Sequence, residues 1–290
     1  MGRKLCSLVL TSCLIFLVAV STASAAKSGP PKWRRLAKGL EYLVWKVDMC
    51  DTLTGQGFCR EGKPIVHVLR IDPNLFSFGV YHYSMYGQDA QPMKIEEWRS
   101  RLDAAAAFNA GEYYPDFSYM GLLVNSHWLF STKQHPDWQG IFEAEPHDED
   151  SARARIVDLK YDSFDLRRTT YSQIAQSMML FDATGAKRIK RSDWSGNRTA
   201  LAEDEKGRIL VFVTEGDYTL WDVAQMLQES PFNLVQAMAL DGGYRSALSI
   251  SYGGVNFSMH GQWETSDYGD VSLPGLKIGL PAVIAVFPRE

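Results

Sequence analysis

Metal-binding side chains are scarce in this sequence. The 290 residues include only six histidines and four cysteines. These residues are scattered, and no Cys or His has partners at the spacing of a zinc site. We therefore predict no metal and no other cofactor, and we expect the histidines to have packing roles.

Positive charge is also not in excess. Thirty Lys and Arg residues face 34 Asp and Glu residues, which gives a net charge of −4. Proteins that bind nucleic acid normally present a basic face, so this balance argues against such a partner. No serine stands in a strained nucleophile-elbow motif, and this absence argues against a Ser-His-Asp hydrolase.

Long hydrophobic runs are missing outside the N-terminus. Leu8–Val20 is an apolar run of thirteen residues, whereas a membrane-spanning helix needs about 20. Arg3 and Lys4 precede the run, and the small-residue pattern Ala23–Ala25 follows it. This arrangement is typical of a signal peptide cleaved after Ala25. We expect residues 1–25 to be removed, leaving a bacterial protein exported to the periplasm or the medium without a stable membrane anchor.

The cysteines agree with export. Leu10–Cys13 is similar to a lipoprotein box, but the apolar run continues beyond Cys13, which favours cleavage after the later alanine. Cys6 and Cys13 would leave with the signal peptide. Cys50 and Cys59 remain, and two thiols this close in an oxidising compartment predict a disulfide.

The remaining chain predicts a flexible lead-in and one domain. Residues 26–38 are polar and contain proline, and residues 39–290 are long enough for a sizeable core. Helices are expected at Ile95–Ala107 and at Leu220–Glu229, the second capped by Thr219. Strands are expected at Leu40–Val47, Ile65–Ile71, Phe76–His82, Ile209–Thr214, Ala237–Leu240 and Ala282–Phe287. Groups of strands with helices between them predict an α+β fold with mixed, mostly antiparallel sheets and a few packed helices.

The most informative stretch is Gln236–Ile250. A short apolar run ends in Asp241, and Gly242, Gly243, Arg245 and Ser246 follow. Glycines at the end of a strand let backbone N–H groups face a ligand, and the Asp and Arg would place opposite charges at a sheet rim. This pattern suits an anionic sugar derivative. A plain β-hairpin turn is the alternative, because Asp-Gly is also a strong hairpin motif.

Two further polar groups stand directly against apolar runs. Asn109 opens the first, which continues through Gly111 and Glu112, and Arg198 and Thr199 form the second. Each also has a simpler interpretation, since an Asn often caps a turn and a lone Arg often forms a surface ion pair. Taken one at a time, none of these groups identifies a function.

In their order along the chain these groups resemble the phosphodiester glycosidase family, the relatives of N-acetylglucosamine-1-phosphodiester alpha-N-acetylglucosaminidase. The resemblance covers about Leu40 to the C-terminus. Its motifs are NAGEYYPDFSYMGLLV, AQSMMLFDATGAKRI, NRTALAEDEKGRILVFVTEGDYTLWDVAQML and ALDGGYRSAL. Departures from the family pattern are Glu112, the pair Met178 and Met179, and the pair Tyr244 and Arg245.

The resemblance implies a phosphodiester-glycosidase-like domain that hydrolyses a sugar-1-phosphodiester in a phosphorylated cell-wall or exopolysaccharide-type glycan. It implies that Arg198 holds the phosphate and that Asp241 is the carboxylate that activates water or stabilises the sugar cation. The other implied site residues shape the turn, hold sugar hydroxyls or line the rim: Asn109, Gly111, Glu112, Thr199, Gly242, Gly243, Arg245 and Ser246. For Glu112 and Arg245 a structural salt link is an equal alternative. A non-catalytic glycan- or protein-binding module on the same fold is the alternative function.

Overall fold

The computed structural model describes residues 32–47, 61–126, 128–266 and 269–289. The expected signal peptide and the expected Cys50–Cys59 disulfide lie outside these residues. The described residues belong to one compact unit, Pro31–Glu290. No helix among them is long and apolar enough to cross a bilayer.

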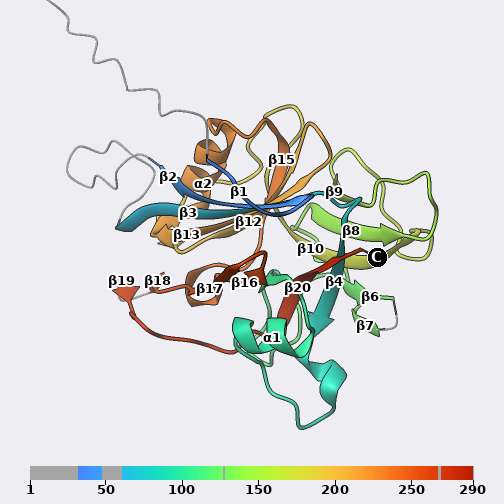
Figure 1. Ribbon diagram of the computed structural model, residues 1–290, viewed down its shortest axis with the longest axis horizontal. Coiled ribbons are helices and arrows are strands. Elements are labelled where there is room, and N and C mark those ends of the chain that lie inside the picture. Colours follow the sequence, from blue (N-terminus) through green and yellow to red (C-terminus); the bar gives the residue numbers. More distant parts are fainter. Residues whose placement is uncertain (1–31, 48–60, 127, 267–268, 290) are drawn as a thin grey trace, which may run out of the picture. The chain divides into compact units, whose positions relative to one another are not determined.

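The largest sheet has eleven antiparallel strands (Figure 1). Nine of them run in the spatial order β1 (Arg34–Ala37), β2 (Leu40–Lys46), β3 (Gly62–Ile71), β13 (Ile209–Gly216), β12 (Thr199–Asp204), β15 (Leu234–Ala239), β10 (Tyr171–Phe181), β6 (Leu123–Asn125) and β7 (Trp128–Ser131). Strand β8 (Gly140–Pro146) also pairs with β10, and β9 (Ala154–Asp158) pairs with β8. Strand β1 falls within the lead-in that was expected to be flexible, so that segment is ordered from Arg34 onward.

Two smaller sheets complete the fold. The five-stranded sheet runs β17 (Val255–His260), β16 (Ala247–Tyr252), β5 (Ala106–Asn109), β20 (Ala282–Pro288) and β4 (Phe76–His82). The four-stranded sheet runs β14 (Tyr218–Thr219), β11 (Ser195–Gly196), β18 (Trp263–Ser266) and β19 (Gly269–Ser272). In Figure 1 strands β2, β3 and β13 of the large sheet lie above β16 and β17.

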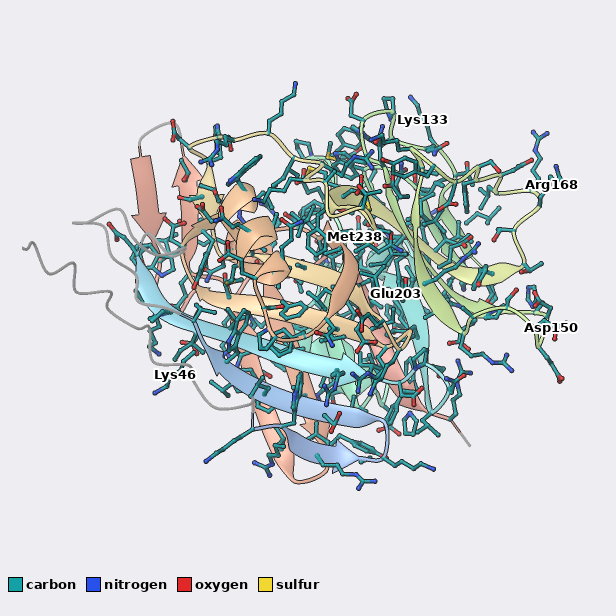
Figure 2. All side chains as sticks on the ribbon, turned by 90° about the horizontal axis from the view of Figure 1, so that it is seen from above. Lys46, Lys133, Asp150, Arg168, Glu203 and Met238 are labelled. Atoms are coloured by element: carbon teal, nitrogen blue, oxygen red, sulfur yellow. The ribbon has the colours of Figure 1, made fainter. Side chains whose placement is uncertain are left out.

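The main core lies between the large and the five-stranded sheet. Leu69, Val211 and Met238 of the first pack in one cluster with Phe108 and Leu248 of the second. Figure 2 shows Met238 among densely packed side chains, while Lys46, Lys133, Asp150 and Arg168 extend outward. Alternating inward-facing residues of two sheets form such a core because each sheet buries one face against the other.

The predicted α+β class is wrong, because the fold is mostly β. The described residues contain two short α-helices, α1 (Ile95–Arg101) and α2 (Leu220–Gln228), and two 3₁₀ turns, η1 (Tyr83–Tyr86) and η2 (Gly243–Arg245). The first predicted helix extended to Ala107, but α1 ends at Arg101. Ala106–Asn109 becomes β5, which is buried between β16 and β20. Strand pairing on both sides therefore overrides the helix propensity of the alanine run.

The second predicted helix and the predicted strands agree with the structure. Helix α2 begins at Leu220, and the Thr219 hydroxyl accepts a hydrogen bond from the Asp222 backbone N–H at 3.1 Å. The six expected strands correspond to β2, β3, β4, β13, β15 and β20, with ends shifted by a few residues. Their apolar runs are long enough to be recognised without tertiary information.

Candidate active site

The segment after β15 carries the chain from one sheet to the other. The Leu240 backbone N–H donates to the Thr199 carbonyl, and the Asp241 N–H donates to the Ala110 carbonyl. Strand β16 then begins in the five-stranded sheet and pairs with β17 and β5, not with β15. The hairpin alternative for Asp-Gly-Gly is therefore wrong, because these residues form a crossover.

A cavity of about 230 Å³ opens at this crossover. It brings together six residues of the predicted site: Glu112, Arg198, Asp241, Gly242, Gly243 and Arg245. It adds five that the sequence analysis missed: Tyr113, Trp194, Ser195, Glu264 and Thr265. Glu264 and Thr265 come from β18, a short strand near the end of the chain, and no sequence motif distinguishes it.

Asp241 is the most buried acid of the cavity. Its Oδ1 accepts a hydrogen bond from the Gly242 backbone N–H at 2.8 Å, and its Oδ2 has no hydrogen-bond partner among the described residues. Burial raises the pKa of Asp241 well above 3.8, although the cation of Arg245 acts against the shift. The charge of Glu112 pushes the same pKa further up. A carboxyl group of this kind can hold or accept a proton at higher pH than an exposed one.

Two more carboxyl groups face the same space. Burial also raises the pKa of Glu112, and the nearby cations of Arg198 and Arg245 oppose this shift. Glu264 lies 3.7 Å from Nη1 of Arg245 through its Oε1. Among the residues that the structure describes, no group of three or more His, Cys, Asp and Glu side chains could hold a metal ion.

Arg198 is held in place by backbone carbonyls. Its Nε donates to the Tyr218 carbonyl at 2.8 Å, and its Nη2 donates to the Trp194 carbonyl at 2.9 Å. Burial lowers its pKa, and the charges of Asp217 and Glu112 act in the opposite direction. Its Nη1 lies beside Gly242 of the Asp-Gly-Gly turn. Arg198 is thus a fixed cation of the cavity and not an exposed ion-pair residue.

The two glycines let charged groups approach the turn. A Cβ atom on Gly242 would lie 2.8 Å from Nη1 of Arg198. Gly243 has φ +61, and a Cβ there would lie 2.6 Å from Cδ of Glu264. Only glycine offers both the left-handed backbone and the space at this turn.

Arg245 closes the other side of the cavity. Its Nε donates to the hydroxyl of Tyr113 at 2.6 Å and lies 3.8 Å from Oδ2 of Asp241. Burial is the main cause that raises the pKa of Tyr113 to about 12, so its hydroxyl keeps its proton. Arg245 therefore links the aromatic wall to two carboxylates within the cavity.

Asn109 and Thr199 were predicted to contact substrate, but they lie behind the cavity. The Asn109 side chain donates to the carbonyls of Ala110 and Asp241 at 3.1 and 2.8 Å. Its Oδ1 accepts from the Thr199 hydroxyl at 2.7 Å and from the Ala247 N–H at 2.9 Å. All its hydrogen-bonding positions are used, so Asn109 is a positioning residue for Asp241.

Gly111 and Ser246 also stand outside the cavity lining. The Gly111 N–H donates to the hydroxyl of Tyr119, and a Cβ on Gly111 would lie 2.4 Å from that oxygen. Ser246 is fully buried, and its hydroxyl has no hydrogen-bond partner within the described part of the chain. Neither residue is placed to hold sugar hydroxyls.

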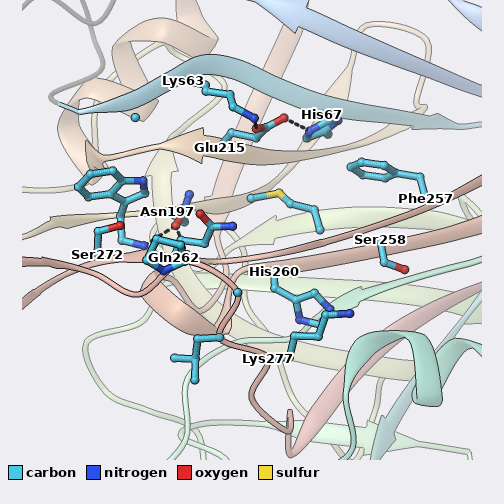
Figure 3. A pocket seen from close by; sticks show the side chains of 16 residues that line it. Lys63, His67, Asn197, Glu215, Phe257, Ser258, His260, Gln262, Ser272 and Lys277 are labelled. Carbon is cyan, nitrogen blue, oxygen red and sulfur yellow. Dashed lines mark hydrogen bonds and ion pairs between the residues drawn. The ribbon is translucent and has the colours of Figure 1, made fainter.

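A larger cavity of about 560 Å³ lies between β3, β13, β17 and residues 272–277 (Figure 3). On one wall Glu215 accepts hydrogen bonds from Lys63 at 3.0 Å and from His67 at 2.8 Å. Although burial acts to raise the pKa of Glu215, these bonds lower it. His260 and Lys277 also line this cavity, and both pair with Glu96 outside the lining. Since the carboxylate of Glu215 is held by Lys63 and His67 and its pKa is lowered, this cavity is the weaker candidate for acid-base chemistry.

Comparison with known proteins identifies the class. The model of the phosphodiester glycosidase family matches residues 103–269, which is more than half of the chain. The chain therefore belongs to the phosphodiester glycosidase family, and it is a hydrolase of this type. This confirms the family suggested by the four sequence motifs. No curated protein sequence matches the chain at a significant level.

Solved structures show the same fold. The catalytic domain of zebrafish N-acetylglucosamine-1-phosphodiester alpha-N-acetylglucosaminidase, auto-inhibited by its pro-peptide, is 16% identical with a TM-score of 0.63, covering 87% of this chain and 85% of that chain. A hypothetical protein from Synechocystis is 13% identical with a TM-score of 0.60, covering 91% of this chain and 65% of that one.

Proposed function

We propose that this hydrolase cleaves the bond between the anomeric carbon of a sugar and a phosphodiester oxygen. The observation that supports the proposal is the convergence of Arg198, Arg245 and Asp241 on one cavity. Two fixed cations suit a phosphate group that gains negative charge as it leaves. A buried carboxyl group beside them suits proton transfer with the attacking water.

The phosphate leaving group of the proposed reaction does not need to be protonated by the protein. As the anomeric C–O bond breaks, the phosphate oxygen keeps the electron pair and is held by Arg198 and Arg245. Water adds its oxygen to the anomeric carbon, and its proton passes to the carboxylate of Asp241 and then to solvent. Glu112 and Glu264 add negative charge that stabilises a sugar with positive character at that carbon.

The substrate we propose is a phosphorylated cell-wall or exopolysaccharide-type glycan. The protein would act on this glycan after export from the cytoplasm. The motif of Arg3 and Lys4, the apolar run and Ala23–Ala25 supports export. Sequencing the N-terminus of the secreted protein should give Ala26. Intact mass with and without reductant should differ by about 2 Da if Cys50 and Cys59 form the proposed disulfide. An uncleaved N-terminus would contradict the export proposal.

The activity is tested with a panel of sugar-1-phosphodiesters, measuring the sugar released. Arg198→Ala should lower kcat/KM roughly 10²–10³-fold, as expected for losing about 3–4 kcal/mol of stabilisation of charge in the transition state. Asp241→Asn should abolish most release and serves as the catalytic control. Full activity of Arg198→Ala would contradict the phosphate assignment. Tight binding of the diesters without release would instead identify a non-catalytic glycan-binding module.

A further inference from the structure

We propose that the surface next to the cavity binds further phosphates of a polymeric glycan, so that the substrate is a chain of glycosyl phosphates and not a single diester. This inference rests on the proposed function. The binding surface is the cationic segment, which we define as Lys187–Arg191, together with the ring of Trp194.

The size of the cavity suits one unit of such a chain. Its volume of about 230 Å³ is below the roughly 300–1,000 Å³ of typical ligand pockets. A polymer can place one glycosyl phosphate in such a space, and its neighbouring units must lie outside. Trp194 lines the cavity and keeps 56% of its surface exposed, which offers an apolar ring face to an adjacent sugar.

Most cations of the cationic segment stand outside the ion pairs of the described residues. Of its four cations, Arg188 pairs with Asp158 and Asp182. Lys187, Lys190 and Arg191 form no ion pair with a described residue. The chain as a whole has a net charge of −4, so this segment is a local exception to an acidic protein. Such a patch attracts anions, and its effect falls with salt.

The segment is fixed in position on the fold. Lys187 forms an isolated β-bridge with Phe181 at the end of β10, and Ile189 packs against a buried apolar cluster that includes Phe212 and Val223. Lys187 Nζ and the Arg191 guanidinium each lie 4.5 Å from the ring centre of Trp221. Cation–π contacts of this kind hold two long side chains that would otherwise be mobile.

Arg198 connects the cationic segment to the cavity through two hydrogen bonds. It donates to the carbonyl of Trp194 at 2.9 Å, three residues after Arg191. It also donates to the carbonyl of Tyr218 at 2.8 Å, three residues before Trp221. Three residues span at most about 10–11 Å. Arg191 therefore stands within about 10–11 Å of chain from Trp194, which lines the cavity and whose carbonyl holds the guanidinium of Arg198.

The test compares an oligomer containing three glycosyl phosphodiesters with the matching single diester. The variant is Lys187→Gln/Lys190→Gln/Arg191→Gln. Its matched control is Lys38→Gln/Arg167→Gln/Lys206→Gln, which removes the same charge from exposed residues elsewhere. Both binding, by fluorescence anisotropy of labelled ligand, and sugar release are measured at low and at physiological salt.

We expect the variant to bind the oligomer roughly tenfold more weakly, the combined effect of three exposed ion pairs, and to lose part of the salt dependence. Its kcat/KM for the single diester should match wild type, and the control should behave as wild type on both ligands. Equal oligomer binding by variant and wild type would overturn the inference. So would single-stranded DNA of equal phosphate number binding as tightly as the oligomer.

The inference and the proposed function fail in different ways. If wild type hydrolyses the single diester but does not prefer the oligomer, the extended surface is wrong and the activity stands. If wild type hydrolyses neither ligand, the proposed activity is wrong, and the binding comparison still decides the role of the cationic segment.

Discussion

The amide of Asn109 donates a hydrogen bond to the main-chain carbonyl of Asp241 at 2.8 Å. The two residues are 132 positions apart, and the bond joins the end of β5 to the crossover after β15. Asn109 thus sets the position of the buried carboxyl group without entering the cavity. The geometry of the cavity therefore depends on residues behind it, such as Asn109, as much as on the residues that line it.

Asn109→Ala should destabilise the protein by about 2–4 kcal/mol, because it leaves the buried Thr199 hydroxyl and Ala247 N–H without their acceptor. Chemical denaturation measures this loss. The exposed Asn74→Ala is the control and should stay within about 0.5 kcal/mol of wild type. In the folded Asn109→Ala variant kcat should fall, because the Asp241 carbonyl is no longer held. Wild-type stability and kcat together would show that Asn109 does not position the site.

The effect of Asp241→Asn on the free energy of unfolding should depend on pH. Since the folded-state pKa of Asp241 is raised, its contribution to stability is fully present below about pH 3.8 and is lost as pH rises through the folded-state pKa. Asparagine cannot ionise and avoids this loss. The variant should gain on wild type by up to about 1.4 kcal/mol per pH unit within that window.

Thermal unfolding at pH 4 and pH 8 measures this difference. The exposed Asp89→Asn should show no such trend. A constant difference between Asp241→Asn and wild type across this range would mean that Asp241 is not held in a burial-raised state. The sugar-releasing activity of Asp241→Asn should fall roughly 10²–10⁴-fold at every pH, as for loss of a general acid-base group.

Gly242→Ala tests the approach of Arg198 to the turn. The added Cβ would lie 2.8 Å from Nη1 of Arg198, so the guanidinium must move away from the cavity. Gly242 has φ −117, which any residue adopts, so the backbone itself is not strained. We expect kcat/KM to fall about tenfold or more, as for a misplaced catalytic group, with little change in stability. Unchanged kcat/KM would place the functional part of Arg198 elsewhere.

Tyr113→Phe removes the acceptor that holds Nε of Arg245 at 2.6 Å. Without it the guanidinium is free to collapse onto the carboxylates of Asp241 and Glu264. Loss of one hydrogen bond to a charged group corresponds to about 1.5–3 kcal/mol, so we expect KM to rise about tenfold or more with a smaller change in kcat. The neighbouring Tyr114→Phe is exposed and serves as the control. If both variants behave alike, Tyr113 does not position Arg245.

Local sequence patterns predicted the elements with strong periodicity and failed where tertiary pairing decides. The strand expected at Ile209–Thr214 and the helix expected at Leu220–Glu229 are present, with ends shifted by one or two residues, because their apolar spacing is clear. Ala106–Asn109 was misassigned to a helix, because alanine-rich sequence favours a helix until two neighbouring strands enclose it. One such error, with short strands that have no pattern, was enough to misassign the fold class.

By itself the sequence determined the family, and it indicated Arg198 and Asp241 because both stand in ordered motifs, while Glu112 and Arg245 were departures from those motifs that the cavity also contains. Only the tertiary structure decided that Asn109 and Thr199 lie behind the cavity and that Glu264 lies within it. The reason is physical. A polar residue beside an apolar run can point to solvent or to the interior, and the choice depends on strands from distant parts of the chain.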